Sequence, residues 1–239
     1  NSPEIILTTD IYNTDLENNT DMIHCHFIEE FTDLLVSPVW RDSYLEISTS
    51  QVPAEVHQTK TIGSLTSPLI EIAPPPAASS FRSSLGKSDY EQLNLKYRIL
   101  ASAIASGLIQ ASYETAKQYA NERPQGGRLI KDWSQIQYQL GNLHLGCIAT
   151  SSLMNQAMEL IKESRRLNNQ DVQQLTGISL KILLELNPLV DESISILGGF
   201  GYMKDYPQEK RFRDAKHVSC LFNGNNYYLL KMGKQGSNE

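Results

Sequence analysis

The chain has 239 residues, of which 40% are hydrophobic and 20% charged, and its formal net charge is −6. This composition is that of a globular protein, and the acidic balance argues against a nucleic-acid surface. No apolar run is long enough to span a membrane, and three widely spaced cysteines (Cys25, Cys147 and Cys220) predict reduced thiols and a cytoplasmic location.

Residues 1–86 read as a small β-rich segment that ends in a linker. Tyr44–Ser48 alternates apolar and polar residues, which is the pattern of a half-buried strand. Residues 67–72 predict another strand, and residues 74–80 form a Pro- and Ala-rich linker. His24-Cys25-His26 offers too few ligands for zinc, so we predict no metal site.

From residue 88 the apolar residues recur at spacings of three and four, the pattern of amphipathic helices. Residues 87–239 therefore predict an antiparallel bundle with two very long helices, and the fold class is mostly α. The first apolar stripe contains Tyr97, Leu100, Ala101, Ile104, Ala105, Leu108 and Ile109. The second contains Trp133, Ile136, Leu140, Leu143, Cys147, Met154, Met158 and Ile161.

Turn residues mark where these helices end. Pro124, with Gly126-Gly127, stops the first helix. Asn168, Asn169 and Asp171 are candidate caps for a third helix, which Pro188 is expected to bend. The residues on the apolar stripes, Tyr97 and Trp133 among them, are expected in the core.

Short motifs stand at the ends of the predicted helices. Gly107–Gln110 leads into the first, Tyr119–Arg128, and the others are in chain order Ile196–Tyr202, Tyr206–Lys210, Arg213–Lys216 and Phe222–Asn225. Their order across residues 88–233 resembles the C-terminal domain of the acyl-CoA dehydrogenase family. Lys60–Ser64 and Leu69–Ile72 are similar to the end of the family's central β-domain. The resemblance also implies an N-terminal helical domain, which we expect to be absent from this chain or carried by a partner.

The resemblance implies dehydrogenation of an acyl thioester, in which a carboxylate takes the α-proton and a flavin accepts the β-hydrogen as hydride. The usual base is a Glu in the last motif, where this chain has Asn223, and an amide does not accept a proton at neutral pH. Other members place the base before an Arg on the first long helix. Here Tyr97 precedes Arg98, and a phenol is a poor base. We therefore expect no catalytic base in this chain.

The positions that contact the flavin in the family match this sequence better than the positions of the catalytic base do. The resemblance implies FAD bound by Arg123, Gln125, Gly198, Gly199, Gly201 and Asn225. An Arg can fork onto phosphate, and Gly lets backbone approach a ligand closely. Gly126 stands where an aromatic residue is usual, so we expect the flavin site to be weakened. Arg98 is the expected substrate-binding residue, with an interior or interface salt bridge as the alternative.

The resemblance leads to three hypotheses about function. The first is a flavoprotein subunit that binds or acts on an acyl thioester and needs another chain for the base, as a homo-oligomer or with a dehydrogenase subunit. The second is a flavin-dependent oxidoreductase or monooxygenase of different chemistry, which needs no α-proton base. The third is a non-catalytic interaction module. The alternative to flavin binding is a purely structural role for these residues. Arg123 would then only stabilise a helix C-terminus through its charge, and Gly198–Gly201 would only end a helix.

Overall fold

The computed structural model describes short stretches of backbone between residues 5 and 82, and then residues 87–163, 167–221 and 224–236. The chain divides into two compact units, Asn1–Asn94 and Leu95–Glu239. The division falls within the first turns of the first helix, a few residues after the predicted boundary at residue 86. That residues 1–86 and 87–239 are separate folding domains remains a prediction.

The first unit contains strands, as the sequence predicts. One sheet has the strand order β1 (Ile5–Leu7), β3 (Leu34–Arg41), β4 (Tyr44–Gln51) and β7 (Ser79–Arg82). Here β1 pairs in parallel with β3, and the other pairs are antiparallel. A second sheet has the order β2 (Ile23–Cys25), β6 (Leu69–Ile72) and β5 (His57–Thr59). Strand β7 takes in Ser79 and Ser80, which we expected in the linker.

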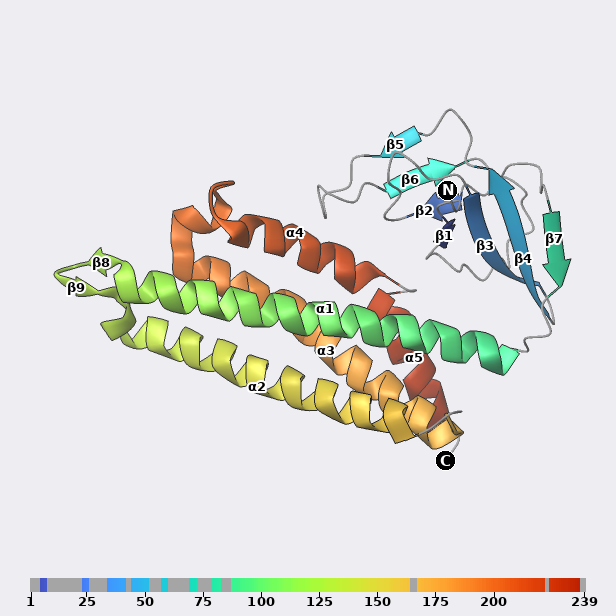
Figure 1. The fold of residues 1–239 in the computed structure, drawn as a ribbon. Coiled ribbons are helices and arrows are strands. Elements are labelled where there is room, and N and C mark those ends of the chain that lie inside the picture. The colour runs from blue at the N-terminus through green and yellow to red at the C-terminus, as the bar shows by residue number, and fades with distance from the viewer. Residues whose placement is uncertain are drawn as a thin grey trace. The chain divides into compact units, whose positions relative to one another are not determined.

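The second unit is a bundle of long helices, which confirms the predicted fold class (Figure 1). Its helices are α1 (Lys87–Glu122), α2 (Ser134–Glu163), α3 (Asn169–Leu197), α4 (Pro207–Cys220) and α5 (Gly224–Gly236). Helix α1 is tied to α3 by Ser102, whose Oγ donates to Ser179 O at 3.3 Å. None of the described helices is long and apolar enough to cross a membrane.

The helix ends follow from local chemistry. After α1, β8 (Pro124–Gln125) and β9 (Arg128–Leu129) form a hairpin around Gly126 and Gly127. Both glycines have positive φ, 59° and 81°, as a two-residue hairpin turn of type I′ requires. Helix α3 starts with a capping box between Asn168 and Asp171, two of the three predicted caps, and Pro188 lies inside the helix.

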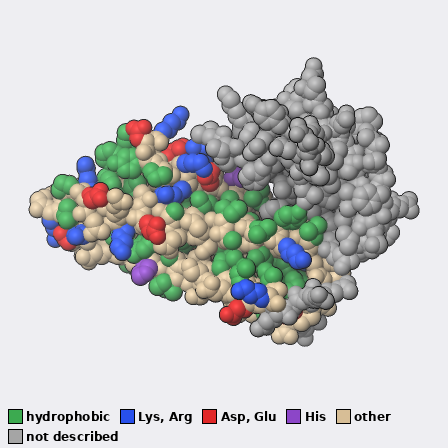
Figure 2. Space-filling view, in the orientation of Figure 1, with side chains coloured by type: hydrophobic (Ala, Val, Ile, Leu, Met, Phe, Trp, Pro, Cys, Tyr) green, Lys and Arg blue, Asp and Glu red, His purple; other side chains and the backbone are tan. Residues whose placement is uncertain are grey.

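The apolar stripes are only partly buried. Ala101, Ala105, Ile109, Leu143 and Cys147 lie in the core, as predicted. The prediction was wrong for four residues, which are between 40% and 61% exposed: Leu100, Ile104, Trp133 and Met158. The stripes are wider than the contact that one helix makes inside this bundle, so part of each faces outward. Figure 2 shows hydrophobic side chains at the surface on the visible face of the bundle, among polar and charged ones.

A buried polar cluster joins α1, α3 and α4. The amide nitrogen of Gln208, at the start of α4, donates to Ser112 Oγ on α1 at 3.1 Å and also to Ser193 Oγ on α3. The Gln208 side chain is fully buried, and its Oε1 accepts from Arg211 at 3.2 Å. Arg211 also donates to Thr115 on α1 at 2.6 Å. This cluster sets the position of the loop between α3 and α4.

Candidate functional site

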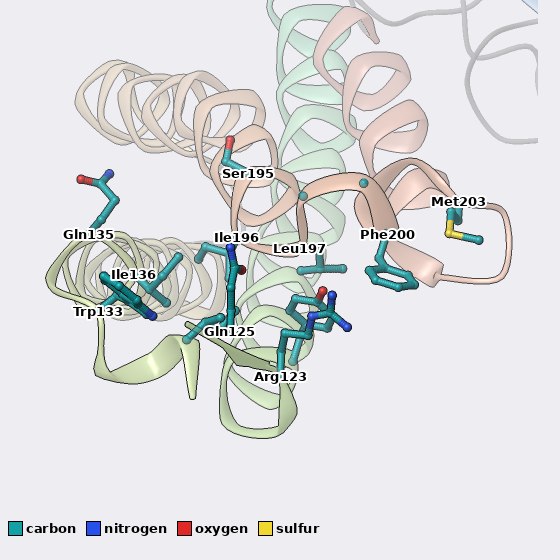
Figure 3. A pocket seen from close by; sticks show the side chains of 14 residues that line it. Arg123, Gln125, Trp133, Gln135, Ile136, Ser195, Ile196, Leu197, Phe200 and Met203 are labelled. Carbon is teal, nitrogen blue, oxygen red and sulfur yellow. The ribbon is translucent and has the colours of Figure 1, made fainter. Parts of the chain in front are cut away.

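An open pocket of about 710 Å³ lies at one end of the bundle (Figure 3). It is bounded by the end of α1, the β8–β9 hairpin, the start of α2 and the turn after α3. Arg123 and Phe200 lie together on one side of it, Trp133 and Ile136 lie on the other, and Gln125 lies between them. The pocket thus combines a cation with aromatic and aliphatic walls.

Four of the six residues expected at the flavin line this pocket, namely Arg123, Gln125, Gly198 and Gly199. The backbone of Arg123 closes α1, because its N–H donates to Tyr119 O at 3.0 Å and its carbonyl accepts from Ile130 N at 2.9 Å. These bonds fix where the side chain starts. Its guanidinium lies over the Phe200 ring, 5.4 Å from the ring centroid, and the residue is exposed toward the pocket.

The glycines of the turn after α3 differ in what the fold requires of them. Gly198 has a φ of 59°, which a side chain would strain, and Gly201 is buried where a Cβ would lie 3.0 Å from Ile194 O. Gly199 has neither constraint: its φ is not positive, and a Cβ there would meet nothing within 4 Å. The turn is η2 (Gly198–Tyr202), a 3-10 helix that ends in the exposed Tyr202. The described fold therefore gives no steric reason for a glycine at 199, where the pocket opens.

An aromatic cluster supports the polar side of the pocket. The Phe200 ring lies 5.9 Å from the Tyr119 ring and 5.3 Å from the Tyr206 ring, centroid to centroid. Tyr206 directly precedes α4, which Gln208 anchors in the core. This packing fixes η2 and the Phe200 ring beneath the Arg123 guanidinium.

Arg98 and Asn225 do not lie in this pocket but meet each other elsewhere in the bundle. Arg98 Nη2 donates to Asn225 Oδ1 at 3.4 Å, and the guanidinium carbon lies 3.8 Å from the centroid of the Tyr228 ring. The Arg98 side chain is fully buried, and burial lowers its pKa to about 10, so it remains a cation at neutral pH. In this conformation the buried Arg98 side chain contacts Asn225 and Tyr228 of α5, and its role in binding a substrate stays a prediction.

Of the two positions expected for a base, the structure describes only Tyr97. Tyr97 is half-buried on α1, and burial raises its pKa above the ordinary value for a phenol. The phenolate, which is the form that could accept a proton, is therefore populated still less at neutral pH than in an exposed tyrosine. Asn223 lies outside the described residues.

Among the pocket residues that sequence reasoning missed are two large aromatic ones. Trp133 was expected in the core, yet it is 40% exposed and lines the pocket, and Phe200 was not singled out at all. The hairpin around Gly126 brings the Trp133 ring to the pocket, and a helical periodicity carries no signal of such a turn. The position of Phe200 between the glycines of the turn was the one available clue.

The comparisons with known proteins agree with this architecture. The family model described as "Acyl-CoA dehydrogenase, C-terminal domain" matches residues 91–233. The chain belongs to the acyl-CoA dehydrogenase family. The match covers all the helices from α1 to α5 for most of their length, together with the pocket and the Arg98 cluster.

Relatives within the family are distant and longer. An acyl-CoA dehydrogenase of Bacillus subtilis (strain 168) is 34% identical over 134 residues, which are 54% of this chain and 33% of that protein. The mitochondrial short/branched chain specific acyl-CoA dehydrogenase of Bos taurus is 30% identical over 128 residues, or 53% of this chain and 28% of that protein. The matched segments thus span about a third of these relatives.

Solved structures show the same fold at lower identity. Glutaryl-CoA dehydrogenase of Mycobacterium smegmatis has a TM-score of 0.79 at 15% identity, covering 98% of this chain and 65% of that one. An acyl-CoA dehydrogenase of Geobacillus kaustophilus has a TM-score of 0.76 at 14% identity, covering 97% of this chain and 68% of that one. The acyl-CoA dehydrogenase scaffold is therefore shared by sequence and by structure.

Proposed function

We propose that the pocket between Arg123 and Gly199 binds FAD and that the chain is an acyl-CoA-dehydrogenase-like flavoprotein subunit. The observation that carries the proposal is the lining of the pocket. Arg123, held at the end of α1, lies on the same pocket as the turn after α3, and in that turn the fold gives no steric reason for a glycine at position 199. A guanidinium pairs with phosphate, and a glycine lets the backbone N–H groups approach it. Aromatic walls suit the flat rings of a dinucleotide.

The chain's role in the reaction is to help hold the flavin and not to take the substrate proton. FAD, when bound, supplies the acceptor for hydride. Tyr97 is raised in pKa by burial, and the sequence has an amide at Asn223, so neither suits removal of an α-proton near neutral pH. A carboxylate from another chain, in a hetero-oligomer with a dehydrogenase subunit, would complete such a site. An acyl thioester is the proposed substrate class.

The experiment is to purify the chain from cells supplied with riboflavin and to record its absorbance across the flavin bands. We expect bound FAD, identified after release by its chromatographic retention. Arg123→Ala should weaken FAD binding roughly ten- to a hundred-fold, because a charge-assisted contact is worth about 1.5–3 kcal/mol. Equilibrium dialysis of FAD against each protein measures this change.

Lys181→Ala is the matched control, since it removes one positive charge from an exposed site on α3. It should leave FAD binding unchanged. Equal FAD affinity in the Arg123→Ala variant and the unmodified chain would show that Arg123 does not hold phosphate. A chain that binds no FAD, alone or with a dehydrogenase subunit, would favour the non-catalytic interaction module instead.

One observation favours a second function: neither position expected for a base carries a carboxylate. A flavin-dependent oxidoreductase or monooxygenase of different chemistry would need the same pocket but no base at Asn223 or Tyr97. Bound FAD that is reduced by NADH or NADPH, and not by acyl-CoA thioesters with any partner chain, would favour this second function.

A further inference from the structure

One row of side chains near the C-terminal end of α1 contacts the turn η2 and helix α4. The row contains Ser112, Thr115, Tyr119 and Arg123, and spacings of three and four residues put its members on one face of the helix. Its two ends differ in burial: Ser112 is fully buried, whereas Arg123 is exposed at the pocket. The row therefore leads from the core of the bundle to the pocket.

The buried end of the row is joined to α4 by hydrogen bonds. Gln208 donates from its amide nitrogen to Ser112 Oγ at 3.1 Å, and Arg211 donates to Thr115 Oγ1 at 2.6 Å. The Gln208 amide also donates to Ser193 Oγ on α3, so three helices meet at one side chain. A hydrogen bond weakens steeply when its distance or angle departs from the optimum, and these bonds therefore fix the position of α4 on α1.

The pocket end of the row is joined to η2 by ring contacts. The centroid of the Tyr119 ring lies 5.9 Å from that of Phe200 and 6.4 Å from that of Tyr206. The guanidinium carbon of Arg123 lies 5.4 Å from the centroid of the Phe200 ring (Figure 3). Burial of apolar surface is non-directional, so these contacts hold η2 against α1 but allow it to slide.

We propose that Gln208 is a positioning residue for the pocket, because its buried hydrogen bonds set where η2 lies against the end of α1. They thereby set the separation of Arg123 from Gly199, which rests on the proposed function of these two residues in holding a phosphate group. Tyr206, whose ring packs on Phe200, stands two residues before Gln208, so a shift of α4 passes directly to η2. Gln208 is fully buried and does not line the pocket, so it acts through other residues.

A matched serine on α1 separates this role from a general contribution to stability. Ser102 is fully buried like Ser112, and it also ties α1 to a neighbouring helix, since its Oγ donates to Ser179 O at 3.3 Å. It lies outside both the row and the pocket lining. If buried polar contacts served stability alone, Ser102→Ala and Ser112→Ala would affect the pocket equally. The proposal predicts an effect of Ser112→Ala only.

The first measurement is FAD affinity, by equilibrium dialysis of full-length variants whose helical circular dichroism matches that of the unmodified chain. Gln208→Ala should weaken FAD binding roughly two- to thirty-fold, the range for a residue coupled to a site through a packed network. Ser112→Ala, which removes one of the bonds, should lose less and serves if Gln208→Ala does not fold. Ser102→Ala should bind FAD as the unmodified chain does.

A double-variant cycle asks whether Gln208 acts through Arg123. In a chain that already carries Arg123→Ala, the additional Gln208→Ala change should weaken FAD binding by less than about two-fold, because the cation that it would misplace is gone. A loss of fold stability would instead act equally with and without Arg123.

The second measurement is hydrogen exchange by mass spectrometry, which reports on η2 without FAD. The Met203 N–H is bonded to Phe200 O at 3.2 Å, and the Tyr206 N–H is bonded to Met203 O at 3.0 Å. Gln208→Ala and Ser112→Ala should speed deuterium uptake in residues 198–206, because amides of a loosened turn open more often. Residues 124–133 provide the internal control and should exchange as in the unmodified chain. Ser102→Ala should change neither segment.

The outcomes separate this inference from the function on which it rests. If the unmodified chain binds FAD, but Gln208→Ala binds it equally well or loses the same factor with and without Arg123, the positioning role is overturned and the flavin site stands. If the chain binds no FAD, but uptake in residues 198–206 responds to Gln208→Ala and Ser112→Ala alone, the flavin site is overturned and the placement of η2 by Gln208 stands. Uptake that none of the variants changes overturns that placement.

Discussion

Asn223 and Tyr97 carry an amide and a phenol at the two positions where the family resemblance places a carboxylate. Around Tyr97 the fold makes an ionised side chain still less available, because burial raises the pKa of the phenol. The neighbouring Arg98 points into the bundle and packs against the Tyr228 ring. The expectation that this chain has no base of its own therefore rests on the residue types at these two positions.

We expect the purified chain, loaded with FAD, to leave acyl-CoA thioesters unchanged. Asn223→Glu should restore flavin reduction when the other parts of the site are supplied by a partner, since a general base is worth about 10²–10⁴ in rate. Asn223→Gln is the control, with the length of Glu but no carboxylate. The measurement is anaerobic bleaching of the flavin by a panel of saturated acyl-CoA thioesters. Bleaching by the unmodified chain, free of contaminating dehydrogenase, would contradict the assignment of both positions.

Among the elements, α4 depends on one buried side chain for its position. Gln208 bonds to Ser112 on α1 and to Ser193 on α3, and a buried polar group that loses its partner carries a desolvation cost. Because Tyr206 and the turn η2 come immediately before α4, the cluster also holds one wall of the pocket.

Gln208→Ala should therefore lower the free energy of unfolding by about 1–3 kcal/mol. Gln110→Ala removes the same side chain from an exposed site on α1, where it bonds only Glu114 among the contacts described, and should change stability by less than about 0.5 kcal/mol. Urea unfolding followed by helical circular dichroism gives both values. Equal stability of the two variants would show that the buried cluster contributes nothing to the fold.

At the scale of the whole molecule, the exposed hydrophobic residues indicate a partner. Four of them lie along α2, and three of these four are more than half exposed: Tyr138 at 72%, Leu145 at 63% and Ile148 at 54%. On α1, Leu100 and Ile104 are also more than half exposed. Apolar surface of this kind on a long helix is typical of a protein–protein interface, and closed symmetric assemblies are the most common kind.

We expect the purified chain to self-associate, as a homo-oligomer, at micromolar concentration. Leu145→Lys should shift it toward smaller species, because a charge buried in an apolar interface has no partner. Ser151→Lys adds the same charge at an exposed polar position of α2 and should leave the assembly unchanged. Light scattering coupled to size exclusion measures the mass. A monomer in the unmodified chain would contradict self-association, and a mass that Leu145→Lys does not alter would place the interface on another face.

The sequence by itself determined the elements and the family. The spacing of apolar residues from 88 onward predicts long helices because a helix repeats every 3.6 residues, and Pro124, Gly126 and Asn168 mark ends through backbone properties that are local. The order of the motifs identified the scaffold in the same way, since it needs no knowledge of contacts. These predictions agree with α1, α2, α3 and the family match.

Only the tertiary structure decided which residues share a site. It places Arg123 in the same pocket as Gly198 and Gly199, although α2 and α3 separate them in the sequence. Asn225 was expected at the same flavin site, but the fold places it against Arg98. It also exposes Trp133 and Leu100, although both lie on apolar stripes, because a helix buries only the part of its stripe that its neighbours cover. Periodicity states that a side chain is apolar and on a given face; packing between distant segments decides whether that face meets the core, a ligand or another protein.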